Sequence, residues 1–151
     1  MTHGEWKALK DLDATAQYAR AVYRHLPDGA VVILTGPLGA GKTTFVRAFV
    51  DAAGGPEGVS SPTYTLMHEY PTDRGPVVHV DAYRLQDAAD AHSLGLDDAI
   101  DRAHFTLVEW GDRIASALPP AWRLDLARPA RHDGEPGTVR HAKLTAPGEM
   151  A

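Results

Sequence analysis

Apolar runs alternate with amphipathic segments in the first third of the chain, in the order expected of an α/β protein. Residues 30–35 (AVVILT) form a short apolar, β-branched run, which is typical of a strand buried on both faces of a sheet. Residues 13–26 and 42–53 have the amphipathic pattern of helices, and Gly54 and Gly55 end the second of them. The pattern therefore predicts a helix, a buried parallel strand and a second helix.

The middle of the chain predicts two strands followed by a polar helical region. Residues 63–70 and 77–83 look like strands, and the turn-forming residues 71–75 join them into an antiparallel hairpin. Residues 86–102 are acidic and rich in alanine, which predicts one or two short solvated helices broken near Gly95.

The last third of the chain predicts three more strands. Residues 105–110 (FTLVEW) form a buried strand, and residues 112–118 form a helix that a proline pair ends. Residues 122–127 and 138–145 alternate between apolar and polar positions. This alternation predicts a closing antiparallel hairpin at one edge of the sheet.

Residues 36–43 (GPLGAGKT) complete the phosphate-binding loop pattern G-x-x-x-x-G-K-[ST] between the first strand and the second helix. The glycines allow positive φ angles, so that backbone N–H groups can converge on phosphate oxygens at the helix N-terminus. Lys42 supplies a positive charge for the β- and γ-phosphates, and the Thr43 hydroxyl is suited to Mg²⁺. The predicted nucleotide-binding residues are Gly36, Pro37, Leu38, Gly39, Ala40, Gly41, Lys42, Thr43 and Thr44.

The loop and the order of elements together predict the fold class. We expect an α/β domain resembling P-loop NTPases, with a mixed sheet, a parallel centre, antiparallel hairpins and helices on both faces. We predict that residues 1–151 form a single domain and that residues 1–12 and 146–151 are frayed.

Two carboxylates stand where a phosphate loop needs an acid, at the ends of neighbouring strands. Asp81 follows the run VVHV, and Glu109 follows FTLV. Either one alone could be a strand-end residue facing solvent, but the pair makes it expected that at least one belongs to the site. We assign Glu109, with Thr43, to the Mg²⁺ shell and Asp81 to orienting water or a switch segment, so that the predicted catalytic residues are Lys42, Asp81 and Glu109.

Several other residues have both an ordinary and a functional interpretation. Residues 60–63 (SSPT) could sense the γ-phosphate, although the residues alone favour an ordinary Ser/Pro turn. Arg84 could neutralise phosphate or be a solvated surface arginine. Trp110 is more typical of a core residue, and His79, in the run H-x-D, of a structural histidine.

Composition excludes some classes of function. The 151 residues carry a net charge of −5, which argues against a protein that grips nucleic acid alone. There is no cysteine for a disulfide or a thiolate metal site, and no run approaches the roughly 20 apolar residues of a membrane span. The N-terminal residues lack an apolar signal core, so we expect a cytoplasmic protein that does not act at a membrane.

Four segments in this order and spacing resemble the bacterial TsaE (YjeE) family: GPLGAGKTTF, SSPTYTLMHEY, HVDAYRL and LVEWGDR. The resemblance implies a small Mg²⁺-dependent ATPase that works with TsaB and TsaD. These proteins install threonylcarbamoyl, taken from threonylcarbamoyl-AMP, on the adenosine beside the anticodon of tRNAs that read A-starting codons.

The resemblance also implies that the ATPase does not perform this transfer but resets or licenses the partner complex, and we expect it to meet tRNA only indirectly. By the same resemblance, Lys42 and Thr43 bind phosphate and Mg²⁺, and Glu109 is the acid near the metal. Asp81 is required for activity, residues 60–63 form a switch-like segment, and Trp110 lies near the functional face.

The residues argue against two other classes of nucleotide-binding protein. A GTPase switch usually carries an N-K-x-D motif, and this chain contains no asparagine. A small-molecule kinase needs an acceptor pocket and a lid with arginines, whereas the region between Asp81 and Glu109 is acidic and rich in alanine. The sequence therefore favours an ATPase over both.

Overall fold

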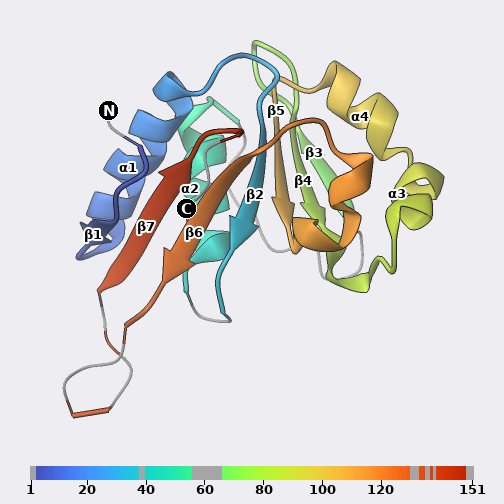
Figure 1. The fold of residues 1–151 in the computed structure, drawn as a ribbon. Coiled ribbons are helices and arrows are strands. Elements are labelled where there is room, and N and C mark those ends of the chain that lie inside the picture. Colours follow the sequence, from blue (N-terminus) through green and yellow to red (C-terminus); the bar gives the residue numbers. More distant parts are fainter. Residues whose placement is uncertain are drawn as a thin grey trace.

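The computed structural model describes residues 3–37, 40–55, 66–129, 133–134, 137 and 139–148. Its strands join into one sheet with the order β1-β7-β6-β2-β5-β4-β3 (Figure 1). The elements are β1 (Lys7–Leu9), α1 (Leu12–His25), β2 (Val31–Thr35), α2 (Lys42–Ala52), β3 (Met67–Tyr70), β4 (Val77–Asp81), η1 (Ala82–Arg84), α3 (Ala88–Leu94), α4 (Leu96–Arg102), β5 (Phe105–Glu109), η2 (Gly111–Ala117), β6 (Trp122–Ala127) and β7 (Arg140–Thr145).

The centre of the sheet is parallel, as predicted. Strands β6, β2, β5 and β4 run in the same direction, while β7 and β3 flank them in antiparallel pairings. The carboxyl ends of the parallel strands therefore meet at one edge of the sheet, which is where open α/β sheets bind ligands. In this register Leu34 lies beside Glu109, and Glu109 lies beside Asp81.

Helices cover both faces of the sheet, because alternate residues of the buried strands point to opposite sides. Helices α1 and α2 pack on one face with β2 residues Val32 and Leu34. Helices α3 and α4 and the 3₁₀ segment η2 pack on the other face, where Val31 of β2 contributes. Figure 1 shows these two layers on either side of β2 and β5.

Local signals set the ends of the first two helices. The Asp11 carboxylate accepts a hydrogen bond from the Ala14 N–H at 2.8 Å and so begins α1. Arg24 and His25 in its last turn are favourable to the helix dipole. The N-cap of helix α2 is Gly41, which has no side chain to cap the first N–H groups of the helix.

The N-terminal end of the chain differs from the prediction that residues 1–12 are frayed. Residues 7–9 form β1, which pairs with β7 and buries Leu9 in the α1–α2 layer. The β6–β7 hairpin is present, but the prediction that it lies at the sheet edge is wrong because β1 covers it. Residues 146–148 belong to no strand or helix, and residues 149–151 lie outside the described residues.

Several predicted boundaries also shift. The strand predicted over 77–83 ends at Asp81, where the chain turns into η1, and the helix predicted over 112–118 is the 3₁₀ segment η2. The acidic segment forms α3 and α4, separated at Gly95 as predicted. No helix in the described parts of the chain is both long and apolar enough to span a membrane.

Candidate functional site

The phosphate-loop pattern lies between β2 and α2, in the context that the sequence predicts. Gly36 and Gly41 have φ angles of +144° and +103°, so both use the conformational freedom of glycine. A Cβ atom on Gly36 would lie 2.5 Å from the backbone oxygen of Leu126, so β6 leaves no room for a side chain there. Leu38 and Gly39 lie outside the described residues.

The start of α2 has the features of an anion site. Gly41 is its N-cap and supplies no side-chain hydrogen bond, so the first N–H groups face the loop. Lys42 Nζ donates a hydrogen bond to the Gly36 carbonyl oxygen at 2.8 Å and lies 4.4 Å from the centre of the Trp110 ring. The lysine ammonium is thereby held across the mouth of the loop.

Both predicted acids lie at the carboxyl edge of the sheet, on the face that α2 covers. Phe105 and Leu107 pack in the α1–α2 layer, and the alternation of β5 places Glu109 on the same side. Val77 likewise places Asp81 on this face. The structure thus brings Lys42 and both acids to one end of the sheet.

The two acids have different surroundings. Glu109 is 6% exposed, and its Oε2 atom lies 2.8 Å from Nε2 of the fully buried His79. Asp81 is half-buried, and its Oδ1 accepts a hydrogen bond from the Tyr83 N–H at 3.0 Å. A buried carboxylate with one oxygen hydrogen-bonded is suited to hold a metal ion in a fixed position. A half-buried carboxylate at a turn has more freedom to change its orientation.

Trp110 is neither a core residue nor an ordinary strand residue. Its φ of +61° is the only positive value of a non-glycine residue in the described part of the chain, and 43% of it is exposed. Bulky residues occupy this region at a cost of about 1–2 kcal/mol, which marks a constrained position. Its ring lies 5.2 Å from that of Tyr83, and the Arg113 guanidinium lies 5.1 Å from the Tyr83 ring.

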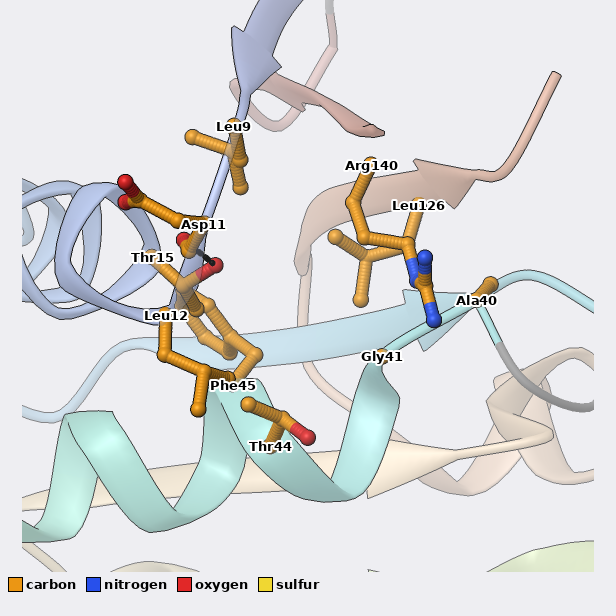
Figure 2. A pocket seen from close by; sticks show the side chains of 10 residues that line it. All are labelled: Leu9, Asp11, Leu12, Thr15, Ala40, Gly41, Thr44, Phe45, Leu126 and Arg140. Carbon is orange, nitrogen blue, oxygen red and sulfur yellow. Dashed lines mark hydrogen bonds between the residues drawn. The ribbon is translucent and has the colours of Figure 1, made fainter. Parts of the chain in front are cut away.

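A cavity of about 180 Å³ extends from the start of α2 towards α1 (Figure 2). Its walls combine apolar side chains with the polar or charged side chains of Asp11, Thr15, Thr44 and Arg140. Figure 2 shows Arg140 reaching down beside Gly41 and Ala40. Sequence reasoning did not find this cavity, because four separate parts of the chain form it. The lining residues are Leu9, Asp11, Leu12, Thr15, Ala40, Gly41, Thr44, Phe45, Leu126 and Arg140.

The donor set near the loop fits Mg²⁺ rather than a metal that needs an all-protein cage. Within the described residues, no group of three or more His, Cys, Asp or Glu side chains is placed to hold a metal ion. Mg²⁺ commonly takes one or two protein oxygens and completes its shell with water and phosphate. The Glu109 carboxylate and the Thr43 hydroxyl are hard oxygen donors of this kind.

Two other predicted site segments, Arg84 and residues 60–63, are not placed at the loop by the described structure. Arg84 is exposed at the end of η1, and it does not line the cavity beside the loop. Residues 60–63, the predicted switch segment, lie outside the described residues.

A sequence model of the family described as threonylcarbamoyl adenosine biosynthesis protein TsaE matches residues 9–135. The chain belongs to the TsaE family. Its role therefore lies in the biosynthesis of tRNA threonylcarbamoyladenosine, as the resemblance implied. The TsaE family match includes the phosphate loop and both acids, while Arg140 lies beyond it.

Individual TsaE proteins are similar over most of their length. The protein from Treponema pallidum is 39% identical over 105 residues, which cover 70% of this chain and 77% of the relative. The one from Streptomyces coelicolor is 34% identical over 137 residues, covering 88% and 90%. A crystal structure of Bacillus subtilis YdiB aligns with a TM-score of 0.75 at 28% identity, covering 95% of this chain and 86% of that one.

Proposed function

We propose that this TsaE-family protein binds and slowly hydrolyses MgATP, and that this activity allows a TsaB–TsaD complex repeated rounds of tRNA modification. The observation that carries the proposal is the complete phosphate loop, which ends at the uncapped N-terminus of α2 beside Lys42. Backbone N–H groups and a lysine at this point favour a polyphosphate. TsaE membership makes threonylcarbamoyladenosine biosynthesis the setting for this activity.

In this proposal each residue of the site has a separate role. The α2 N-terminus and Lys42 bind the phosphates, and Lys42 leaves the Gly36 carbonyl oxygen to do so. Glu109 and Thr43 hold Mg²⁺, which neutralises charge on the β- and γ-phosphates when it is bound. Asp81 orients the attacking water or the segment that carries it.

The cavity beside the loop is suited to the adenosine half of ATP. It begins at Gly41 and Thr44, next to the proposed phosphate position, and its far walls include Leu12 and Phe45. Binding sites for bases are typically apolar clefts with few polar groups. The Arg140 guanidinium is planar and can stack on a base.

Substitution of Arg140 by alanine is expected to weaken ATP binding about two- to thirtyfold, the range that corresponds to a cation–π contact of roughly 0.5–2 kcal/mol. Binding of inorganic tripolyphosphate should not change, because it lacks the base. Titration calorimetry with both ligands separates a contact to the base from a contact to phosphate.

The Arg123→Ala variant is a suitable control for this measurement. Arg123 is also a strand arginine, and its alternation with Leu124 and Leu126 places it on the other side of the sheet from the cavity, where it pairs with Asp112 at 2.6 Å. An equal loss of affinity for ATP and for tripolyphosphate in the Arg140→Ala variant would place the guanidinium at the phosphates. The residues that contact the base would then be unassigned.

The partner complex is proposed to meet the surface formed by Tyr83, Trp110 and Arg113. Tyr83 and Trp110 are 54% and 43% exposed, and Trp110 also contacts Lys42. Exposed aromatic and arginine side chains are enriched at the centres of protein interfaces. A partner on this surface would sense whether Lys42 is engaged with a nucleotide.

Slow ATP hydrolysis by the isolated protein, with a clear rise on addition of TsaB and TsaD, is the expected result of an assay for phosphate release. The physical reason is that Arg140, whose side chain approaches Gly41 of the loop, lines the proposed base cavity, so a partner would have to complete the γ-phosphate site. Such completion can add up to 10³–10⁵-fold. Fast ATP hydrolysis by the isolated protein that does not change on addition of TsaB and TsaD would contradict the proposal.

Contact with tRNA is proposed to be indirect. The net charge of −5 opposes phosphate binding. Of the arginines near the C-terminal hairpin, Arg123 is engaged by Asp112, and this hydrogen bond raises the pKa of Arg123. Its charge is therefore already compensated within the protein.

A further inference from the structure

His79 occupies a position in β4 where an apolar residue would be expected. The strand residues around it, Val77, Val78 and Val80, are fully buried and apolar, and His79 itself is 0% exposed. It points to the α2 face, because it alternates with Val78 and Val80 of the opposite layer. His79 is therefore a polar side chain in an otherwise apolar buried strand, and packing alone does not account for it.

The contact that His79 makes is directional and crosses to the next strand. It lies beside Leu107 in the register of β4 and β5, and its ring reaches towards the carboxyl end of β5. There Nε2 lies 2.8 Å from Oε2 of Glu109, and both side chains are buried. As a metal ligand Glu109 is ionised and its carboxylate only accepts, so Nε2 is the donor of the hydrogen bond in that state.

This pair has little value as a stabilising device. A buried pair of polar or charged groups is often no more stable than apolar residues of the same volume, because both groups lose water. The other ring nitrogen, Nδ1, has no hydrogen-bond partner among the residues that the structure describes. Apolar packing would avoid both costs, so the contact is better explained by its effect on Glu109.

We infer that His79 is a positioning residue, which fixes Oε2 of Glu109 and so directs the other carboxylate oxygen to the Mg²⁺ of the nucleotide complex. The inference rests on the proposed function, in which Glu109 serves the metal. A carboxylate with one oxygen held has lost its rotational freedom before the metal arrives. Hydrogen-bond partners of metal ligands commonly contribute 10- to 100-fold in metal affinity.

The test compares His79→Leu, which removes the donor and keeps an apolar volume, with His79→Gln, which keeps a donor. Calorimetry measures AMPPNP binding in EDTA and then its dependence on Mg²⁺ concentration. We expect His79→Leu to need 10- to 100-fold more Mg²⁺, while AMPPNP affinity in EDTA stays within about twofold. His79→Gln should need a Mg²⁺ concentration close to that of the wild-type protein.

Two further variants separate positioning from a general loss of structure. His104→Leu removes another buried histidine, which lies just before the first residue of β5 and contacts Tyr23 and Phe105 rather than Glu109. It should lower the melting temperature without moving the Mg²⁺ requirement. In the Glu109→Gln background, His79→Leu should add little, because the two residues act through one interaction.

The outcomes distinguish this inference from the proposed function. If the wild-type protein binds AMPPNP without any dependence on Mg²⁺, the proposed metal role fails. If the wild-type protein depends on Mg²⁺ and His79→Leu has the same dependence, only the positioning role is overturned. A parallel loss of AMPPNP affinity in EDTA and in Mg²⁺ would also overturn it, because that pattern indicates structural damage.

Discussion

Replacing Lys42 with alanine is expected to lower ATP affinity about ten- to a hundredfold. The substitution removes a charge-assisted hydrogen bond to phosphate, worth roughly 1.5–3 kcal/mol. In the structure Lys42 bonds to the Gly36 carbonyl oxygen and lies over Trp110, so its ammonium is already at the mouth of the loop. Titration calorimetry with ATP and Mg²⁺ measures the loss.

Lys143→Ala is a matched control for Lys42→Ala. Lys143 also places its ammonium over a tryptophan, 6.0 Å from the centre of the Trp6 ring, but it lies on β7 and does not belong to the loop. Its removal should leave ATP affinity unchanged. Unchanged affinity in the Lys42→Ala variant would refute the assignment of the loop as a nucleotide site.

The two acids are expected to give different phenotypes when each is replaced by its amide. Glu109→Gln should raise the Mg²⁺ concentration needed for half-maximal activity roughly tenfold or more, since a buried ligand is lost. Asp81→Asn should lower turnover about ten- to a hundredfold with nucleotide binding nearly intact, because it acts on the water or the switch segment. Steady-state assays over a Mg²⁺ series, with binding measured in parallel, separate the two.

Glu69→Gln provides the control for these amide substitutions. Glu69 is an exposed acid on the edge strand β3, where it pairs with Arg102 at 3.1 Å. It should affect neither the Mg²⁺ requirement nor turnover. If Asp81→Asn instead raises the Mg²⁺ requirement and Glu109→Gln lowers turnover alone, the roles of the two acids must be exchanged.

Sequence reasoning succeeded where the signal is local. The phosphate loop is a contiguous motif, and the strand before it is apolar throughout, so its place between β2 and α2 was predictable. Asp81 and Glu109 each follow an apolar run, and neighbouring parallel strands bring such ends together. Even the shared face of His79 and Asp81 follows from a period of two residues along β4.

The missed features depend on contacts between distant parts of the chain. Strand β1 has three residues, of which only Leu9 is buried, so no pattern indicates it before the sheet edge is known. Arg140 reaches the loop only because β7 lies beside β6. The positive φ of Trp110 has no local signal either, because the residue type argues against that conformation.

The cavity beside the phosphate loop is closed only when strand β1 has paired with β7. Residues 7–9 pair with β7, so one wall of the cavity joins the first described strand to the last. During synthesis the phosphate loop leaves the ribosome long before Arg140 does. A nascent chain therefore presents the loop before the cavity next to it is closed, and, in the proposed role of the cavity, base binding begins only after β7 has joined the sheet.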